Sequence, residues 1–152
     1  MDRNYNFDSD HIEWTHIQDP DAGYPCEYKT AVLGADPALG RLDLIVKWPP
    51  NSYCHFHRHL ADTTILVLEG EQHIIEIADD GSEGAHTVRP AGTYANSPGG
   101  GDAHMEHGGP EGATVFFALQ SADGRLFETL DKEMNVLASS TVEEMAESLV
   151  SS

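Results

Sequence analysis

The stretch Cys54-His55-Phe56-His57-Arg58-His59, followed by Thr63-Thr64-Ile65-Leu66-Val67-Leu68-Glu69-Gly70-Glu71, decides the fold of this chain. Successive side chains of a strand point to opposite faces, so the three histidines share one face, about 7 Å apart at next-but-one positions. The second part is too short for an exposed helix, is rich in branched apolar residues and ends at Glu-Gly. It predicts a buried strand that returns antiparallel beside the first. Three histidines at alternate positions beside a buried strand favour a binding site over merely polar surface residues.

The composition fits one domain that is mainly β. The chain has 152 residues, enough to bury one core, and its 14 glycines and 8 prolines indicate many turns between short strands. The formal net charge of -18, from 26 acidic and 8 basic residues, repels nucleic-acid phosphates and anionic membranes. We therefore expect neither nucleic acid nor a membrane among its partners.

No targeting or membrane segment is evident. The first residues lack a basic segment followed by an apolar one, and no apolar run approaches the roughly 18 residues of a membrane span. We expect a cytoplasmic protein. Cys26 and Cys54 form neither a disulfide framework nor a metal-knuckle spacing, which predicts reduced thiols.

Apolar alternation and turn residues predict further strands on both sides of the histidine stretch. The expected strands are residues 11–17, 26–33, 41–48, 72–78, 86–89, 114–120 and 125–130. The second and third should form a hairpin through Asp36-Pro37 and Gly40. Residues 1–10 are expected to be a loosely held arm. Thr141 can cap a final helix over 141–150, whose apolar stripe should pack on the rest of the fold or on a sister subunit in a homodimer.

The histidine stretch resembles the first motif of the cupin superfamily. That motif reads glycine, five residues, His-x-His, three or four residues, glutamate, six residues, glycine. Counting back from Gly70, His57 and His59 take the paired places, Asn51 takes that of the first glycine and Thr63 that of the glutamate. Asn suits its place because it tolerates a left-handed backbone.

Another register is open, in which His55 and His57 pair and Asp62 supplies the acid. It needs one residue too many before the closing glycine. The first register is therefore favoured.

A second cupin motif is recognisable but altered. Residues 89–94, Arg-Pro-Ala-Gly-Thr-Tyr, resemble its Pro-x-Gly opening, but Ala95 stands where the motif has its histidine. The glycine-rich residues 96–102 then predict an inserted flexible loop, which is either a plain connector or a mobile rim over the pocket. Of the two histidines that follow, His104 has the family's usual separation from the next apolar strand, whereas His107 lies three residues closer and at opposite strand parity. The resemblance favours His104.

The resemblance covers roughly residues 41–120 within a single domain of 1–152. It implies an all-β double-stranded β-helix, or jelly-roll barrel, with a short C-terminal helix. It also implies a metal ion held by His57, His59 and His104, with His55 and His107 as alternates. Strand parity puts Ile65 and Val67 on the face of Thr63. The pocket is expected to include Thr63, Ile65, Val67 and Tyr94.

Three imidazoles without a carboxylate would leave a divalent ion its full +2 charge, which favours anionic chelators such as enolates. This set is similar to that of the acetylacetone and related β-diketone dioxygenases, cupins that use non-heme Fe(II). The resemblance therefore implies Fe(II) and a small β-dicarbonyl or similar enolisable substrate.

Zn²⁺ or Mn²⁺ also suits these ligands. The chain resembles ChrR-like cupins as well, so a zinc-binding sensor or small-ligand-binding cupin is an alternative. A zinc- or manganese-dependent hydrolase, lyase or isomerase is another. Because no helical sigma-factor-binding module accompanies the cupin motifs, we expect an enzyme or a small-ligand binder rather than the regulator.

Overall fold

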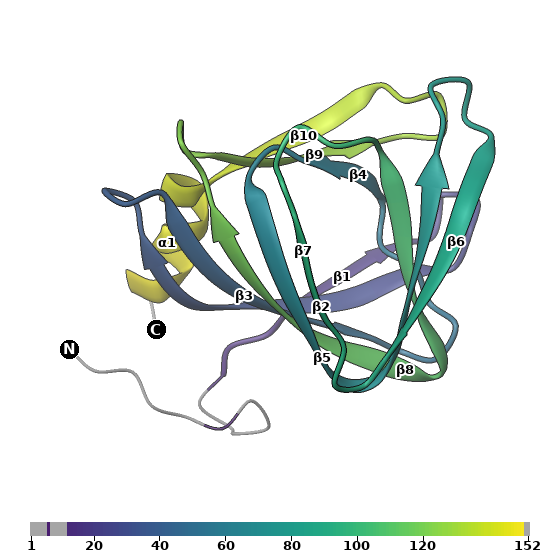
Figure 1. Cartoon of the computed structure of the whole chain (residues 1–152), viewed down its shortest axis with the longest axis horizontal. Helices are drawn as coiled ribbons and strands as arrows, with labels where there is room; N and C mark the ends of the chain where they lie inside the picture. The colour runs from purple at the N-terminus through teal and green to yellow at the C-terminus, as the bar shows by residue number, and fades with distance from the viewer. Residues whose placement is uncertain (1–5, 7–11, 151–152) are drawn as a thin grey trace.

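The computed structural model describes residue 6 and residues 12–150, and its regular structure is almost entirely β (Figure 1). The elements in chain order are β1 (Thr15–Asp19), β2 (Cys26–Asp36), β3 (Arg41–Trp48), β4 (Phe56–His59), β5 (Asp62–Ile77), β6 (Glu83–Pro90), β7 (Tyr94–Ser97), β8 (His104–Gln120), β9 (Arg125–Leu130), β10 (Val136–Thr141) and α1 (Val142–Val150). The predicted all-β fold with a short C-terminal helix is confirmed.

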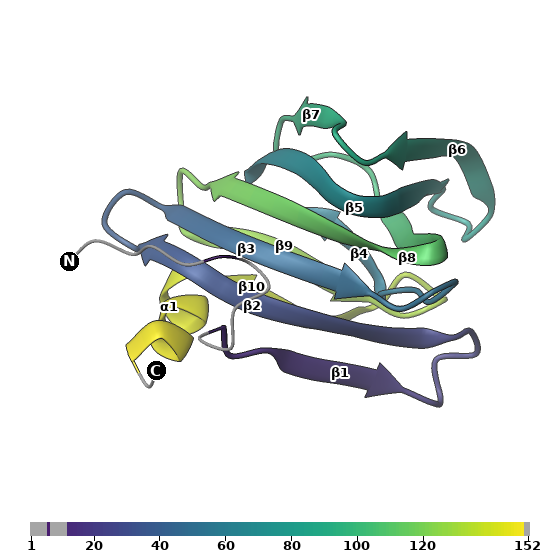
Figure 2. The same ribbon diagram turned by 90° about the horizontal axis from the view of Figure 1, so that it is seen from below.

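One antiparallel sheet curls on itself to form the barrel. Its strands follow the order β1-β2-β3-β8-β4-β9-β10, and β5 pairs with β6, β7 and β8. Figure 2 shows β1, β2, β3, β8 and β5 side by side. The long strand β8 pairs with a different strand at each of its ends. Residues 113–120 pair with β3, while His104 pairs with His57 of β4. This shared strand brings residues near 104 to the face of the histidine strand.

The strand that follows the histidines does not lie beside them. β4 pairs with β8 and β9, whereas β5 pairs with β6, β7 and β8, so the predicted antiparallel return of residues 64–68 beside the histidine strand is wrong. The link between β4 and β5 forms no hairpin because the backbone N–H groups of Leu60 and Ala61 both donate to the carbonyl of Leu126 in β9. The chain therefore leaves β4 for another part of the sheet.

Two predicted turn features are present. β2 and β3 form the expected hairpin, from Asp36 opposite Arg41 to Lys29 opposite Lys47. Asn51, which takes the place of a family glycine, has a left-handed backbone with φ of 56°. Asparagine is one of the few residues that adopt this conformation at little cost.

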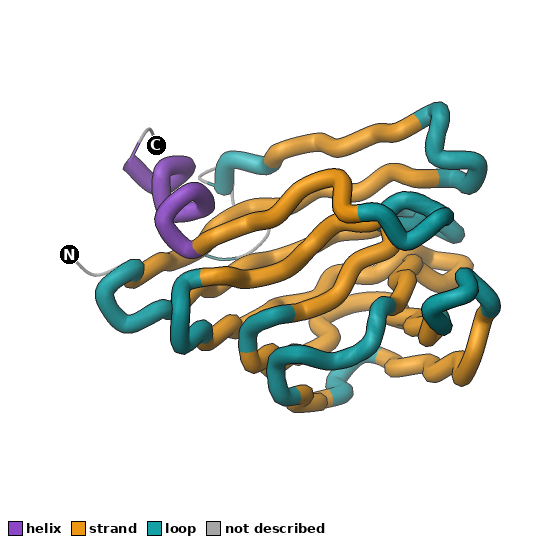
Figure 3. Tube along the Cα trace, turned by 90° about the horizontal axis from the view of Figure 1, so that it is seen from above, coloured by secondary structure: helices purple, strands orange, loops and turns teal. Residues whose placement is uncertain are grey.

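The helix α1 lies at one end of the barrel (Figure 3). Its first turn is capped as predicted, because the Thr141 hydroxyl accepts a hydrogen bond from the Glu144 N–H at 3.2 Å. Val142 is buried and Met145 packs against the main core. The apolar stripe of the helix thus rests on the barrel.

The main core lies between β3, β5 and β8. Its members include Leu42, Leu44, Val46, Ile65, Val67, Val115, Phe117 and Leu119.

On the other face of β3, Ile45 is buried under Ile12 and packed near Trp14. Because residues 12–14 act as this cover, regular pairing begins at Thr15 instead of residue 11. His11 and, apart from Asn6, the predicted arm of residues 1–10 lie outside the described residues.

Both cysteines are buried as free thiols. Within residues 12–150, no helix has the length and apolarity needed to cross a membrane.

Candidate metal centre

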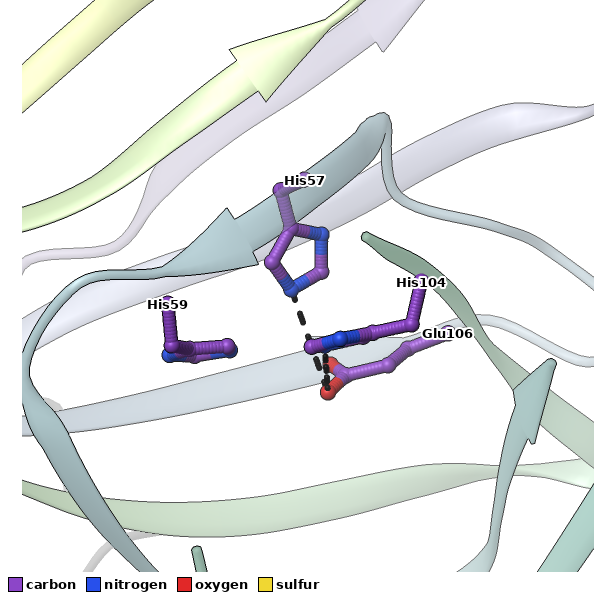
Figure 4. A group of neighbouring side chains, drawn as sticks. All are labelled: His57, His59, His104 and Glu106. Atoms are coloured by element: carbon purple, nitrogen blue, oxygen red, sulfur yellow. Dashed lines mark ion pairs between the residues drawn. The ribbon is translucent and has the colours of Figure 1, made fainter. Parts of the chain in front are cut away.

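Four side chains converge inside the barrel. β4 supplies His57 and His59, and β8 supplies His104 and Glu106 (Figure 4). His57 and His104 are direct cross-strand partners, and their ring centroids lie 4.3 Å apart. One ligand atom from each of the four lies within 4.8 Å of the others. The structure therefore brings together the three histidines favoured from the sequence and adds a carboxylate.

Glu106 is the buried acid of the site. Its Oε1 lies 3.2 Å from Nε2 of His104 and 3.9 Å from Nε2 of His57, and the residue is only 5% exposed. Within the described part of the chain, its ion-pair partners are histidines alone. A buried carboxylate without a basic partner is costly unless a cation offsets its charge.

Each imidazole of the site has its Nδ1 atom near an oxygen acceptor. Nδ1 of His57 lies 2.9 Å from the carbonyl of His55, and Nδ1 of His104 lies 3.4 Å from that of Asp102. Nδ1 of His59 lies 3.1 Å from the Thr63 hydroxyl, which itself donates to the carbonyl of Ala61. A proton on Nδ1 satisfies all three contacts and leaves the Nε2 lone pairs for a metal ion.

Burial and charge set the protonation states. Burial lowers the pKa of His57 to about 4, and nearby His104 adds to the shift. Burial also lowers the pKa of His59 to about 3, with His57 contributing. Burial alone would raise the pKa of Glu106, but the close contacts with His104 and His57 outweigh it and lower that pKa to about 2. Neutral His57 and His59 beside an ionised Glu106 are the states that a divalent cation requires.

Thr63 occupies the place where the first cupin motif has its glutamate, and in the structure it supports His59 through its hydroxyl. The carboxylate comes from β8 instead. Sequence reasoning missed Glu106, although a signal was present: His104-Met105-Glu106 is a His-x-Glu pair, and residues two apart on a strand share a face. The premise of three histidines without an acid therefore needs correction.

The two alternate histidines lie elsewhere. His55 contacts Asp19 through Nε2 at 2.8 Å and the Tyr28 hydroxyl through Nδ1 at 3.3 Å. His107 groups with two other histidines rather than with His57, His59 and His104.

A cavity of about 670 Å³ opens onto the site, a size typical of small-molecule sites. His55, His57, His59 and Glu106 lie in its wall. Most of the remaining lining is apolar or aromatic, including Val46, Trp48, Phe117, Phe127 and Met145. Its polar residues include Tyr28, Thr30, Thr129 and Glu144.

The predicted pocket residues take other places. Ile65 and Val67 are buried in the main core and do not line the cavity. Tyr94 does not line it either, because its position on β7 leaves it 67% exposed. Thr63 is buried behind His59 and acts on the site only through that ring. The prediction failed here because β5 crosses to another part of the sheet, so its inner face fills the core rather than the pocket.

A curled antiparallel sheet with a His-x-His pair on one strand, and a histidine and a carboxylate on another, defines this protein as a cupin. The chain belongs to the ChrR cupin-like domain family, whose model matches residues 3–123. Among curated proteins, no sequence matches the chain.

Solved structures share the fold at low sequence identity. An acetylacetone dioxygenase from Acinetobacter johnsonii matches with a TM-score of 0.67 at 18% identity, over 99% of this chain and 93% of that one. A putative acetylacetone dioxygenase from Methylibium petroleiphilum matches with a TM-score of 0.67 at 15% identity, over 97% and 94%. A cupin 2 conserved barrel domain protein from Rhodopseudomonas palustris gives 0.61 at 13% identity, over 77% of each chain. At these identities the similarity establishes the fold.

Proposed function

We propose that this cupin is a non-heme Fe(II) dioxygenase that cleaves a small β-dicarbonyl or a similar enolisable compound. The observation that carries the proposal is the group His57, His59, His104 and Glu106, of which His57, His59 and Glu106 lie in the wall of a largely apolar cavity. Two structures with the same fold, an acetylacetone dioxygenase and a putative one, agree with this reaction class.

The residues present fit a divalent metal ion. The donor set offers three imidazoles, whose Nδ1 atoms are already engaged, and one buried carboxylate whose ion-pair partners among the described residues are histidines. A ferrous ion held there would supply open coordination positions and reactivity toward dioxygen. Glu106 reduces the net charge of an occupied site from +2 to +1, which still attracts a singly charged enolate.

The cavity wall would hold and orient the substrate. Trp48, Phe117 and Phe127 provide apolar surface that excludes water from the carbonyl groups. Tyr28 and His55 are polar groups in the same wall, in contact with each other at 3.3 Å. Burial raises the pKa of Tyr28, so its hydroxyl stays protonated. Because Nε2 of His55 faces the Asp19 carboxylate, the Tyr28 hydroxyl donates to Nδ1 of His55, and its oxygen can accept a hydrogen bond from the enol form of a substrate. These two residues would therefore fix the orientation of a polar end.

The test is oxygen consumption by protein without a histidine tag, reconstituted anaerobically with Fe(II) and mixed with acetylacetone. We expect oxygen uptake together with a change in the visible absorption of the iron-loaded protein. His16→Gln, which replaces an exposed histidine on β1, should behave like the unchanged chain, while zinc-loaded protein should take up no oxygen. Fully iron-loaded protein that shows neither response would contradict the proposal.

A zinc-binding sensor or small-ligand-binding cupin is a second candidate, favoured by the match to the ChrR cupin-like family. Zinc as the metal found in protein purified without added metal, together with ligand binding that causes no turnover, would support it. Iron in the purified protein with oxygen-dependent turnover would exclude it.

A further inference from the structure

A second group of histidines lies outside the site described above. His73 on β5, His86 on β6 and His107 on β8 come from neighbouring strands, because β5 pairs with both β6 and β8. His107 follows Glu106 directly along β8, so its side chain points to the opposite face from the first site. The described residues thus contain two separate histidine groups, one on each face of the same strand.

The three imidazoles contact one another. Nδ1 of His73 lies 2.9 Å from Nε2 of His86, and the ring centroid of His107 lies 4.4 Å from that of His73 and 5.9 Å from that of His86. One ligand atom from each lies within 4.8 Å of the others. Two neutral imidazole nitrogens at 2.9 Å share one proton between them. A metal ion that replaced this proton could accept a lone pair from both.

Outer contacts hold two of the rings in suitable orientations. Nε2 of His73 lies 3.1 Å from a carboxylate oxygen of Glu71, which leaves Nδ1 facing the other histidines. Nδ1 of His107 donates to the carbonyl of Gly108 at 2.8 Å, which leaves its Nε2 lone pair available. Tyr53 packs against the His107 ring with centroids 4.5 Å apart. Oxygen acceptors behind imidazoles are the usual outer contacts of histidine metal ligands.

We propose that His73, His86 and His107 form a second metal site for a late first-row divalent ion such as Zn²⁺, with Glu71 orienting His73. Zinc bonds to imidazole of about 2.0–2.1 Å place ligand nitrogens about 3.3 Å apart, so the side chains must rotate to close the group. His86 is exposed and His73 and His107 are partly buried. The ion therefore exchanges with solvent more readily than one in the buried site.

An ion bound here would join the edge strand to the barrel. Among the named strands, β6 pairs with β5 alone, whereas β5 also pairs with β8. A ligand from each of the three strands would cross-link β6 to β8 through β5. Backbone amides of β6 should then exchange more slowly with solvent when the site is filled.

The test is zinc titration of metal-free protein without a histidine tag, followed by calorimetry and by metal analysis after gel filtration. We expect two zinc ions per chain in the unchanged protein and one in His86→Gln. In a His57→Gln/His59→Gln background, which removes the first site, one zinc ion should remain. Adding His86→Gln to that background should weaken this binding at least about tenfold.

His16→Gln serves as the matched control, because His16 is an exposed histidine on another strand that contacts one glutamate, and it should change neither stoichiometry. Hydrogen exchange adds a readout independent of activity, with slower exchange in β6 on zinc addition to the unchanged chain and no such slowing in His86→Gln. Absence of zinc binding by the His57→Gln/His59→Gln chain, or two ions in His86→Gln, would overturn the proposal. It does not depend on the reaction proposed for the first site.

Discussion

Thr63 holds the imidazole of His59 through a hydroxyl that donates to Ala61 and faces Nδ1 of His59 at 3.1 Å. Thr63→Val removes this acceptor with little change of shape, so the ring loses its fixed tautomer. We predict metal affinity about 10–100-fold lower, measured by competition with a chelator of known affinity. Thr64→Val is the matched control, because the Thr64 hydroxyl contacts Asn96 instead. Equal affinities for the two variants would contradict this role.

The buried histidines also predict a pH dependence of stability. The pKa values of His57 and His59, about 4 and about 3 in the fold, lie below the value of about 6.5 in an unfolded chain. The unfolded state therefore binds more protons as pH falls below about 6.5, and the metal-free fold loses stability until the folded pKa values are reached. Above pH 6.5 these groups cause no loss.

Denaturant unfolding of the metal-free protein at pH 7.5 and pH 5.5 measures this effect. Each of the two histidines should lower the free energy of unfolding by roughly 1 kcal/mol at pH 5.5 relative to pH 7.5. In His59→Gln, which keeps only one of the two histidines, the decrease in the free energy of unfolding between pH 7.5 and pH 5.5 should be smaller by about 1 kcal/mol. An unchanged pH dependence in that variant would contradict the burial argument.

At the residue scale, the sequence predicted part of the site. Strand alternation put His55, His57 and His59 on one face, and the resemblance to the first cupin motif, counted back from Gly70, selected His57 and His59; the structure places both beside His104. The same strand alternation could have identified Glu106, because it lies two residues after His104. It was overlooked because the family pattern places the acid at Thr63. Tyr94 could not be placed, since the direction of a side chain on a short edge strand depends on pairings that local sequence does not specify.

At the scale of elements, the glycine-rich loop after β7 is anchored to the histidine strand. The N–H of Gly100 donates to the carbonyl of His59 at 3.0 Å, and the N–H of Gly99 donates to Asp62 at 2.8 Å. A Cβ added at Gly99 would lie 2.2 Å from the carbonyl oxygen of Leu60. The loop therefore needs glycine where it passes the end of β4.

Gly99→Ala should displace the loop, at a cost of about 1–3 kcal/mol of stability, and should weaken metal binding through His59. Gly101→Ala is the matched control, because a Cβ there meets nothing within 4 Å. Thermal unfolding and metal titration of the two variants check this prediction. A Gly99→Ala variant as stable as Gly101→Ala would show that the loop is not seated against β4.

Most strands were predictable because turn residues and apolar alternation act locally. The hairpin of β2 and β3 and the cap at Thr141 are examples, and both are confirmed. The partner of β5 was not predictable in this way. A short link suggested a hairpin, but hydrogen bonds to Leu126, more than 60 residues away in sequence, direct the chain elsewhere.

At the scale of the whole molecule, the net charge of -18 opposes compaction through self-repulsion. Salt screens charges that lie more than about 10 Å apart at 0.1 M. Raising NaCl from 10 mM to 300 mM should therefore weaken the repulsion. A gain of about 1 kcal/mol in the free energy of unfolding corresponds to a Tm higher by roughly 2–4 °C. Near the isoelectric point the same addition should have a smaller effect. A Tm that falls with salt at pH 7.5 would contradict the charge argument.

The central claim is that His57, His59, His104 and Glu106 hold one metal ion inside the barrel. X-ray absorption spectroscopy of the His86→Gln chain, loaded with one equivalent of Fe(II) per chain, tests it most directly. The account predicts three imidazole nitrogens and one carboxylate oxygen among the ligands, with the carboxylate lost in the added variant Glu106→Gln. Fewer than three imidazoles, or a ligand set unchanged by Glu106→Gln, would contradict it.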